Sequence, residues 1–230
     1  MLRINGIDMD MDENFKGKVV EAVSSNMHKN YDSIADVLET EYGFPALDPV
    51  RYEICLCVIC GFNQAALTLT NHLLESALKK FLILHDSRTN TRKSCELSSV
   101  FADATDKYAD KGLNDIIEYA YACGLIDDRE KELLHDFRKA YRNPYSHANP
   151  KQIHPNMPFP IKLLRIDEIN SEGDFQKFFE MPNTEVNPQY FLPIQGILQV
   201  LKTESCVKDY FLKVDEIVRR VYTRLHSENS

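Results

Sequence analysis

The sequence lacks the features of several common functional classes. No uncharged apolar run approaches the roughly 20 residues that a membrane-spanning helix needs. Residues 1–13 are acidic, without the basic and then apolar pattern of a secretory signal. Positive charge is not in excess either: the formal net charge is −8 and the pI is near 5.4. This acidic balance argues against broad, nonspecific binding to DNA or RNA. We therefore expect a soluble, cytoplasmic protein that grips any nucleic acid at one local site.

The six cysteines also lack the pattern of a secreted domain held by disulfides. A chain of 230 residues with 43% apolar residues can build a core without such bridges. Cys57 and Cys60 have the C-x-x-C spacing, with Cys55 close by, but no second pair of Cys or His stands out to complete a zinc site. All three lie in an apolar, helical run. Core packing is therefore favoured over metal or redox chemistry.

Apolar residues recur at helical spacing along most of the chain. This periodicity predicts an all-α, up-and-down helical bundle over residues 48–230, preceded by an N-terminal helical extension over residues 1–47. The spine is expected at residues 50–85, where the apolar stripe nearly encircles the helix, with a bend near Gly61. Eight of the ten prolines fall between residues 144 and 193. Residues 148–193 are therefore predicted to be a largely irregular insertion, with a short strand within Phe159 to Ile166.

Local signals predict where individual helices begin and end. Asp127 followed by Glu130 has the pattern of a capping box, and Gly124 fits the left-handed residue that closes the preceding helix. A polar loop is expected at residues 86–94. Pro144 disfavours a helical conformation for the residue before it, so the helix that begins near Asp127 is predicted to end there.

The stretch Arg142-Asn143-Pro144-Tyr145-Ser146-His147 follows that helix. It joins a permanent cation to the one side chain whose unperturbed pKa lies near neutrality. Cleavage of a phosphodiester without metal needs this combination. The residues alone leave other interpretations open: Arg142 could bind the last carbonyls of its helix, Asn143 could be an ordinary turn residue, and His147 could lie at a surface or an interface.

Two other sets of residues are weaker candidates. His72 and Glu75 lie three residues apart on the spine, and such a pair can ligate a metal within a bundle. Di-metal bundles need pairs from two helices, and no second pair is evident, so we expect no metal site and interpret Glu75 as a partner for Arg142. Arg219-Arg220 and His226 repeat the Arg–His spacing without the polar residue and turn, and we interpret them as chance matches.

Two segments together resemble the HEPN domain family. Gly61-Phe62-Asn63-Gln64-Ala65-Ala66, followed by Leu73-Leu74-Glu75-Ser76-Ala77-Leu78-Lys79, is similar to the first core helix of HEPN domains. Leu133 to Tyr141, followed by Arg142-Asn143-x-x-x-His147, is similar to the HEPN signature of an Arg, a polar residue and then a His. The resemblance covers roughly residues 50 to 147 and leaves the N-terminal segment and the proline-rich insertion unexplained.

The resemblance implies a four- or five-helix bundle that dimerises. In active members the two Arg-x-x-x-x-His segments meet in one cleft and act as a metal-independent endoribonuclease. His147 would then be the general acid and base, and Arg142 would stabilise charge on the scissile phosphate. Asn143 would orient the motif or donate a hydrogen bond to the phosphate. Tyr145 and Ser146 would contact the substrate, and Glu75 and Arg138 would support the site. Tyr145 could stack on a base, although a packing role is left open.

The partners implied are an RNA substrate, a second copy of the chain and a nucleotidyltransferase-like antitoxin, for which the Tyr145 hydroxyl is a candidate for modification. No cofactor or metal is expected. The predicted function is that of a toxin or phage-defence effector. The alternative is a catalytically inactive HEPN-like bundle that acts as a binding or regulatory module. The net charge of −8 favours this alternative, whereas the intact Arg142, Asn143 and His147 favour the nuclease.

Overall fold

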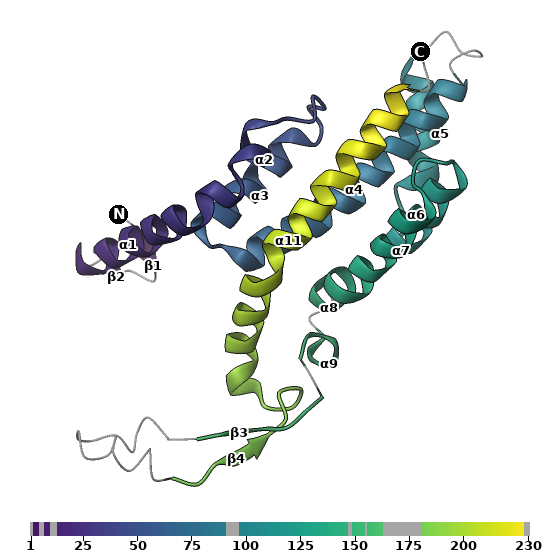
Figure 1. Cartoon of the computed structure of the whole chain (residues 1–230). Coiled ribbons are helices and arrows are strands. Elements are labelled where there is room, and N and C mark those ends of the chain that lie inside the picture. Colours follow the sequence, from purple (N-terminus) through teal and green to yellow (C-terminus); the bar gives the residue numbers. More distant parts are fainter. Residues whose placement is uncertain are drawn as a thin grey trace.

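The computed structural model describes residues 2–4, 7–9, 13–90, 97–146, 149–154, 156–162 and 181–227. Over these residues the predicted all-α bundle is confirmed, with two small two-stranded sheets beside it (Figure 1). The elements are β1 (Leu2–Ile4), β2 (Ile7–Met9), α1 (Glu13–Asn30), the 3-10 turn η1 (Tyr31–Ser33), α2 (Ala35–Glu39), α3 (Asp48–Cys60), α4 (Asn63–Asn90), α5 (Leu97–Tyr108), α6 (Leu113–Ala122), α7 (Asp128–Phe137), the π-helical turn η2 (Arg138–Arg142), α8 (Asn143–Ser146), α9 (Pro150–Ile153), β3 (Phe159–Ile161), β4 (Thr184–Val186) and α11 (Leu192–Ser227).

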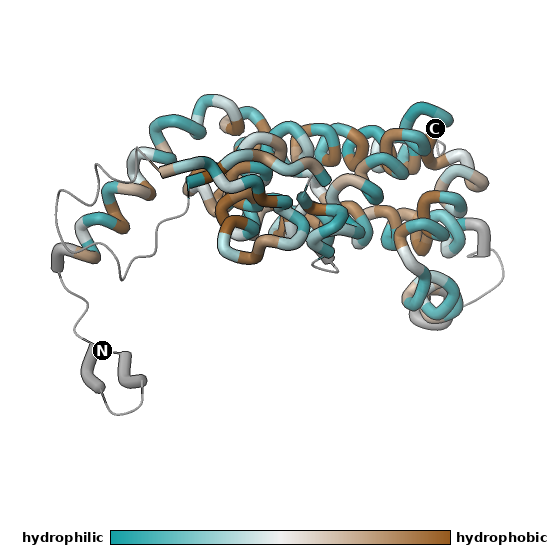
Figure 2. The backbone as a smooth tube through the Cα atoms, turned by 90° about the horizontal axis from the view of Figure 1, so that it is seen from below, coloured by the Kyte–Doolittle hydropathy of each residue, from teal (hydrophilic) through white to brown (hydrophobic). Residues whose placement is uncertain are grey.

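Helix α4 is the centre of the bundle. It runs alongside the second half of α11, with α3 and α1 on one side and α6, α7 and η2 on the other (Figure 1). Figure 2 shows apolar residues recurring along these packed helices, as expected when each helix turns one face toward a shared core. Fully buried side chains of that core include Leu73, Leu74, Phe81, Tyr108, Tyr210 and Phe211. No helix of the described ranges is both long and apolar enough to cross a membrane.

The predicted spine is two helices rather than one bent helix. Helix α3 ends before Gly61, which has a left-handed backbone with φ of +79°, and α4 begins two residues later. The terminal carbonyls of α3 are capped by α1, because Asn26 Nδ2 donates to Cys60 O at 3.2 Å and Asn30 Nδ2 donates to Val58 O at 3.1 Å. A Cβ atom at Gly61 would lie 2.5 Å from Asn26 Nδ2. The left-handed backbone favours glycine there, and a Cβ atom would also displace the Asn26 amide from its capping position.

The segment between α1 and α3 shares the core of the bundle. Ile34, Tyr42 and Leu47 are buried in the same cluster as the residues of α4 and α11. The Tyr42 hydroxyl donates to Asp215 Oδ1 of α11 at 2.7 Å, and Arg219 of α11 donates to the Thr40 carbonyl at 2.8 Å. The packing is therefore continuous across residue 47.

Two further boundaries differ from the sequence-based expectations. The loop expected at residues 86–94 is wrong in its first part, because α4 continues to Asn90, and residues 91–96 lie outside the described ranges. Side-chain contacts on the last turns of α4, such as the hydrogen bond from Lys107 to Asp86 at 2.7 Å, stabilise the extra turn. In the proline-rich segment a strand is present at Phe159–Ile161 and pairs antiparallel with β4, with Phe159 opposite Val186, while residues 163–166 of the expected strand lie outside the described ranges.

Candidate functional site

Arg142 is the last residue of a π-helical turn that extends α7. The predicted capping box starts this helix: Asp127 Oδ1 accepts from Glu130 N at 2.8 Å, and Glu130 Oε2 accepts from Asp127 N at 3.0 Å. The predicted end before Pro144 is wrong. Asn143 N donates to Arg138 O five residues back, and α8 continues directly from it. We attribute the continuation to the π turn, whose wider register accommodates the proline ring and its missing N–H.

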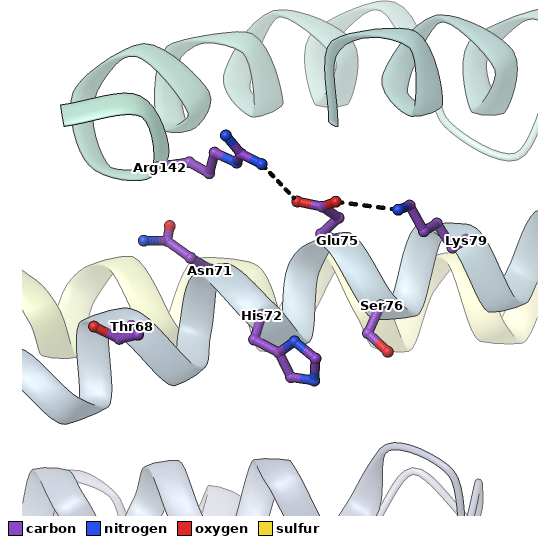
Figure 3. Close-up of a pocket in the computed structure, with 7 residues that line it drawn as sticks. All are labelled: Thr68, Asn71, His72, Glu75, Ser76, Lys79 and Arg142. Atoms are coloured by element: carbon purple, nitrogen blue, oxygen red, sulfur yellow. Dashed lines mark hydrogen bonds and ion pairs between the residues drawn. The ribbon is translucent and has the colours of Figure 1, made fainter. Parts of the chain in front are cut away.

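The widened turn holds the Arg142 side chain against α4 (Figure 3). Arg142 Nη2 lies 3.2 Å from Glu75 Oε2, and Lys79 Nζ lies 3.2 Å from Glu75 Oε1. Lys79 also donates to the Ala109 carbonyl at 2.9 Å. The three charged side chains are 26%, 24% and 21% exposed, for Arg142, Glu75 and Lys79 respectively. One carboxylate between two cations leaves an excess of positive charge, which attracts an anion.

Buried hydrogen bonds fix the backbone beside Arg142. Asn71 Nδ2 donates to the Tyr141 carbonyl at 3.4 Å, and the Tyr210 hydroxyl donates to Asn71 Oδ1 at 2.8 Å. The rings of Tyr141 and Tyr210 pack with their centroids 4.3 Å apart. Burial raises the pKa of Tyr210 well above its usual value, so the phenol remains a donor at any physiological pH. The turn that carries Arg142 is thereby tied to both α4 and α11.

A polar pocket opens along α4 beside this turn, lined by Thr68, Asn71, His72, Glu75, Ser76, Lys79 and Arg142. Asn71, Glu75 and Lys79 form a row of i, i+4 neighbours that points toward Arg142, whereas His72 points to the other side of the helix (Figure 3). His72 and Glu75 therefore point in different directions although they are only three positions apart. The expected contact between Glu75 and Arg142 is present.

The other predicted site residues lie in different environments. Asn143 is half-buried at the start of α8, Ser146 ends α8, and His147 lies outside the described residues. Tyr145 packs against the core, and its hydroxyl oxygen is buried without a hydrogen-bond partner in the described part of the chain. Burial raises the pKa of Tyr145 to about 12. This placement matches the packing role that the sequence left open, and stacking on a base would require Tyr145 to move.

Arg138 lies one turn before Arg142 at the start of η2. Its Nε atom is buried and has no hydrogen-bond partner within the described ranges. Arg138 is not among the residues that line the pocket on α4. Its predicted supporting role would therefore act through packing of the turn rather than through contact with a ligand in this pocket.

Sequence reasoning did not assign Asn71 or Lys79 to the site. Both stand one helical turn from Glu75, and Asn71, like Thr70, is a polar residue on the buried face of α4. A buried amide needs hydrogen-bond partners, so a polar residue at such a position points to a partner element. That element, the turn at Tyr141, is 70 residues away in sequence.

The other arginine candidates have structural partners. Arg219 Nε lies 2.7 Å from Asp215 Oδ2 on its own helix, and Arg220 Nε lies 3.1 Å from Glu130 Oε1 of α7. His226 lies near the end of the same helix, with its Nδ1 atom 2.8 Å from the Tyr222 carbonyl. The Arg220 contact joins α11 to α7, whereas the other two lie within α11, and none of these three residues lines the pocket on α4.

The cysteines of α3 behave as packing residues. Cys55 is fully buried, and Cys57 is half-buried against the core. Burial raises the pKa of Cys55 to about 11 and also raises the pKa of Cys57. Both thiols therefore stay protonated at neutral pH, which lowers their nucleophilicity, and within the described ranges neither belongs to a group of three or more potential metal ligands.

Comparison with known proteins finds no relative of this chain. No protein-family model, curated protein or solved structure matches the chain. The likeness to HEPN domains therefore depends on the two segments quoted above, and a function has to be argued from the chemistry of the pocket.

Proposed function

We propose that the chain is a HEPN-type endoribonuclease that cleaves RNA without a metal ion, at a site shared by two copies of the chain. The observation that carries this proposal is the position of Arg142, whose guanidinium contacts a carboxylate on a neighbouring helix at the wall of a pocket. Because that carboxylate is partly exposed, the ion pair contributes only about 0–1 kcal/mol, and a phosphate can displace it at little cost.

The reaction follows from the chemistry of an imidazole and a guanidinium at one phosphodiester. His147 removes the proton from the ribose 2′-hydroxyl, the 2′-oxygen forms a bond to phosphorus, and the bond from phosphorus to the 5′-oxygen breaks. An imidazolium returns a proton to the leaving 5′-oxygen, so the products carry a 2′,3′-cyclic phosphate and a 5′-hydroxyl. Arg142 holds the phosphate and stabilises the charge that develops on its oxygens, with Asn143 as an additional donor.

The net charge limits how the RNA is held. At −8 the chain does not offer a general basic surface, so the substrate contacts would concentrate at Arg142 and Lys79, doubled when two copies meet. Such an enzyme would act in the cytoplasm on cellular or phage RNA as a toxin or defence effector. A nucleotidyltransferase-like antitoxin would be its neutralising partner.

A second candidate is a HEPN-like bundle that binds a partner or senses a ligand without catalysis. It is favoured by the neutralisation of Arg142 by Glu75, because in the single chain this arginine already has a counter-ion. In that case the pocket would bind an anion and no bond would break.

The test is an RNA cleavage assay with the full chain in the presence of a chelator, using total RNA and tRNA. We expect cleavage in chelator that leaves 2′,3′-cyclic phosphate ends and falls by about 10²- to 10⁴-fold in His147→Ala. His226→Ala, which alters an exposed histidine of α11, is the matched control and should cleave like the wild type. Light scattering should give the mass of a dimer.

Intact RNA at high protein concentration, with a dimer and with phosphate binding to the pocket, would reject the nuclease and leave the binding module. Cleavage that persists undiminished in His147→Ala would reject the assignment of the acid and base.

A further inference from the structure

A second cluster of ionisable side chains lies at the C-terminal end of α4, away from the Arg142 pocket. His85 and Asp86 belong to α4, and Cys123 follows the last residue of α6. One ligand atom from each, an imidazole nitrogen, a carboxylate oxygen and the Sγ atom, lie within 4.8 Å of one another, and all three residues are half-buried. Along α4 the cluster is roughly 15 Å from Glu75.

The Asp86 carboxylate is oriented by groups of α5. Lys107 Nζ donates to Asp86 Oδ2 at 2.7 Å, and the Tyr108 hydroxyl donates to the same oxygen at 2.8 Å. The other oxygen, Oδ1, lies 3.3 Å from His85 Nδ1. Metal-ligating carboxylates are commonly held by a neutral donor such as the Tyr108 hydroxyl on one oxygen, with the other oxygen directed at the ion.

We propose that His85, Asp86 and Cys123 form a zinc site that joins the end of α4 to the end of α6. Imidazole, carboxylate and thiolate are the three ligand types that Zn²⁺ accepts, and three protein ligands leave one tetrahedral position for water. The thiolate and the imidazole disfavour Mg²⁺ and Ca²⁺, which prefer oxygen ligands. The ion stabilises the bundle and takes no part in cleavage at Arg142, so this site is independent of the proposed nuclease.

Protonation of the ligands makes zinc binding dependent on pH. Burial and the charge of Asp86 raise the pKa of Cys123, so zinc must displace a proton from this thiol. Burial alone would raise the pKa of Asp86, but hydrogen bonds from Lys107, Tyr108 and His85 outweigh it and keep the pKa below its usual value. The carboxylate is therefore ionised at neutral pH and can act as an anionic ligand.

Lys107 opposes the ion. Its ammonium group shares the Asp86 carboxylate and would lie near a divalent cation, but the side chain is 51% exposed and can turn toward solvent. Removal of this charge should therefore tighten zinc binding, by roughly fivefold or more. A role of Lys107 in stability alone predicts no such gain, so this variant separates a metal site from an ordinary ion pair.

The experiment is a titration of the full, reduced chain with Co²⁺ as a spectroscopic probe, after removal of metals by a chelator, followed by displacement with Zn²⁺. We expect one Co²⁺ per chain, with a thiolate-to-cobalt absorption band that disappears in Cys123→Ser. His85→Gln should weaken binding by at least about tenfold, and Lys107→Met should tighten it. Zn²⁺ should raise the melting temperature of the wild type but not of Cys123→Ser.

The control is the Cys57→Ser/Cys60→Ser double variant, which alters the C-x-x-C pair of α3 and should leave the band unchanged. Absence of stoichiometric binding, or a band that disappears in this control, would overturn the proposal. If Cys123→Ser fails to fold by circular dichroism, Lys107→Met and His85→Gln decide the question, and unchanged affinity in both would reject it. RNA cleavage in chelator reports on the proposed nuclease separately.

Discussion

Two glutamates of this bundle each face an arginine from another helix, and they differ in almost every other respect. Glu130 of α7 is 3% exposed and is held by both terminal nitrogens of Arg224 and, at 3.1 Å, by Arg220 Nε, while it also completes the capping box at Asp127. Glu75 of α4 is 24% exposed and meets Arg142 through one contact of 3.2 Å.

The difference separates a structural ion pair from one that a ligand can open. Glu130 is enclosed by its partners and fixes the start of α7 to α11. Glu75 lines a pocket, shares its second oxygen with Lys79 and leaves part of the Arg142 guanidinium accessible. Loss of a partner in a buried pair leaves an uncompensated charge, whereas a partly exposed pair exchanges one counter-ion for another or for water.

The largest effect on stability is expected at the buried pair. Glu130→Ala removes the buried counter-ion of Arg224, which is 34% exposed and also lies 3.6 Å from Asp127, and one half of the capping box, so it should lower the free energy of unfolding by about 2–4 kcal/mol. Urea unfolding monitored by circular dichroism measures it. Glu118→Ala is the control, because Glu118 is 48% exposed where it pairs with Lys131 and His135, and it should have a much smaller effect. Equal losses in the two variants would remove the distinction between the pairs.

An intermediate effect is expected at Asn71, which fixes the turn beside the exposed pair. Asn71→Leu leaves the buried Tyr210 hydroxyl without its acceptor and should lower the free energy of unfolding by about 1–3 kcal/mol. The Asn71→Leu/Tyr210→Phe double variant should recover part of that loss, since no hydroxyl then remains unpaired. A double variant that is less stable than the sum of both changes would contradict this explanation.

The smallest effect on stability is expected at Glu75. Glu75→Gln should change the free energy of unfolding by less than about 1 kcal/mol. It should nevertheless tighten binding of a cleavage-resistant 2′-O-methyl RNA by roughly fivefold, because Arg142 and Lys79 lose their shared counter-ion. Fluorescence anisotropy measures the affinity. Glu118→Gln makes the same change in net charge away from the pocket, and an equal gain there would mean that the pocket is not the binding site.

The sequence predicted the helices better than their junctions. The capping box at Asp127 and the left-handed Gly124 depend on neighbouring residues, and both are present as predicted. The break at Gly61 and the continuation past Pro144 depend on tertiary contacts. The first needs the amides of Asn26 and Asn30 as caps, and the second needs a π turn held by Asn71.

The site was predictable only in part for the same reason. The contact between Glu75 and Arg142 was predicted from the sequence as the alternative to a metal site at His72 and Glu75, and it is present. The burial of the Tyr145 hydroxyl depends on how α8 packs against the core, which helical periodicity does not specify. The cluster of His85, Asp86 and Cys123 joins residues from two helices without a recognisable spacing, and so carries no sequence signal.

Cleavage of RNA in chelator by Arg142→Ala and Arg220→Ala tests the central claim most directly. Both arginines bind a glutamate, but only Arg142 lines the pocket on α4. We predict that Arg142→Ala slows cleavage by about 10²- to 10³-fold and that Arg220→Ala leaves the rate near that of the wild type. A wild-type rate in Arg142→Ala, or no cleavage by the wild type itself, would contradict the account.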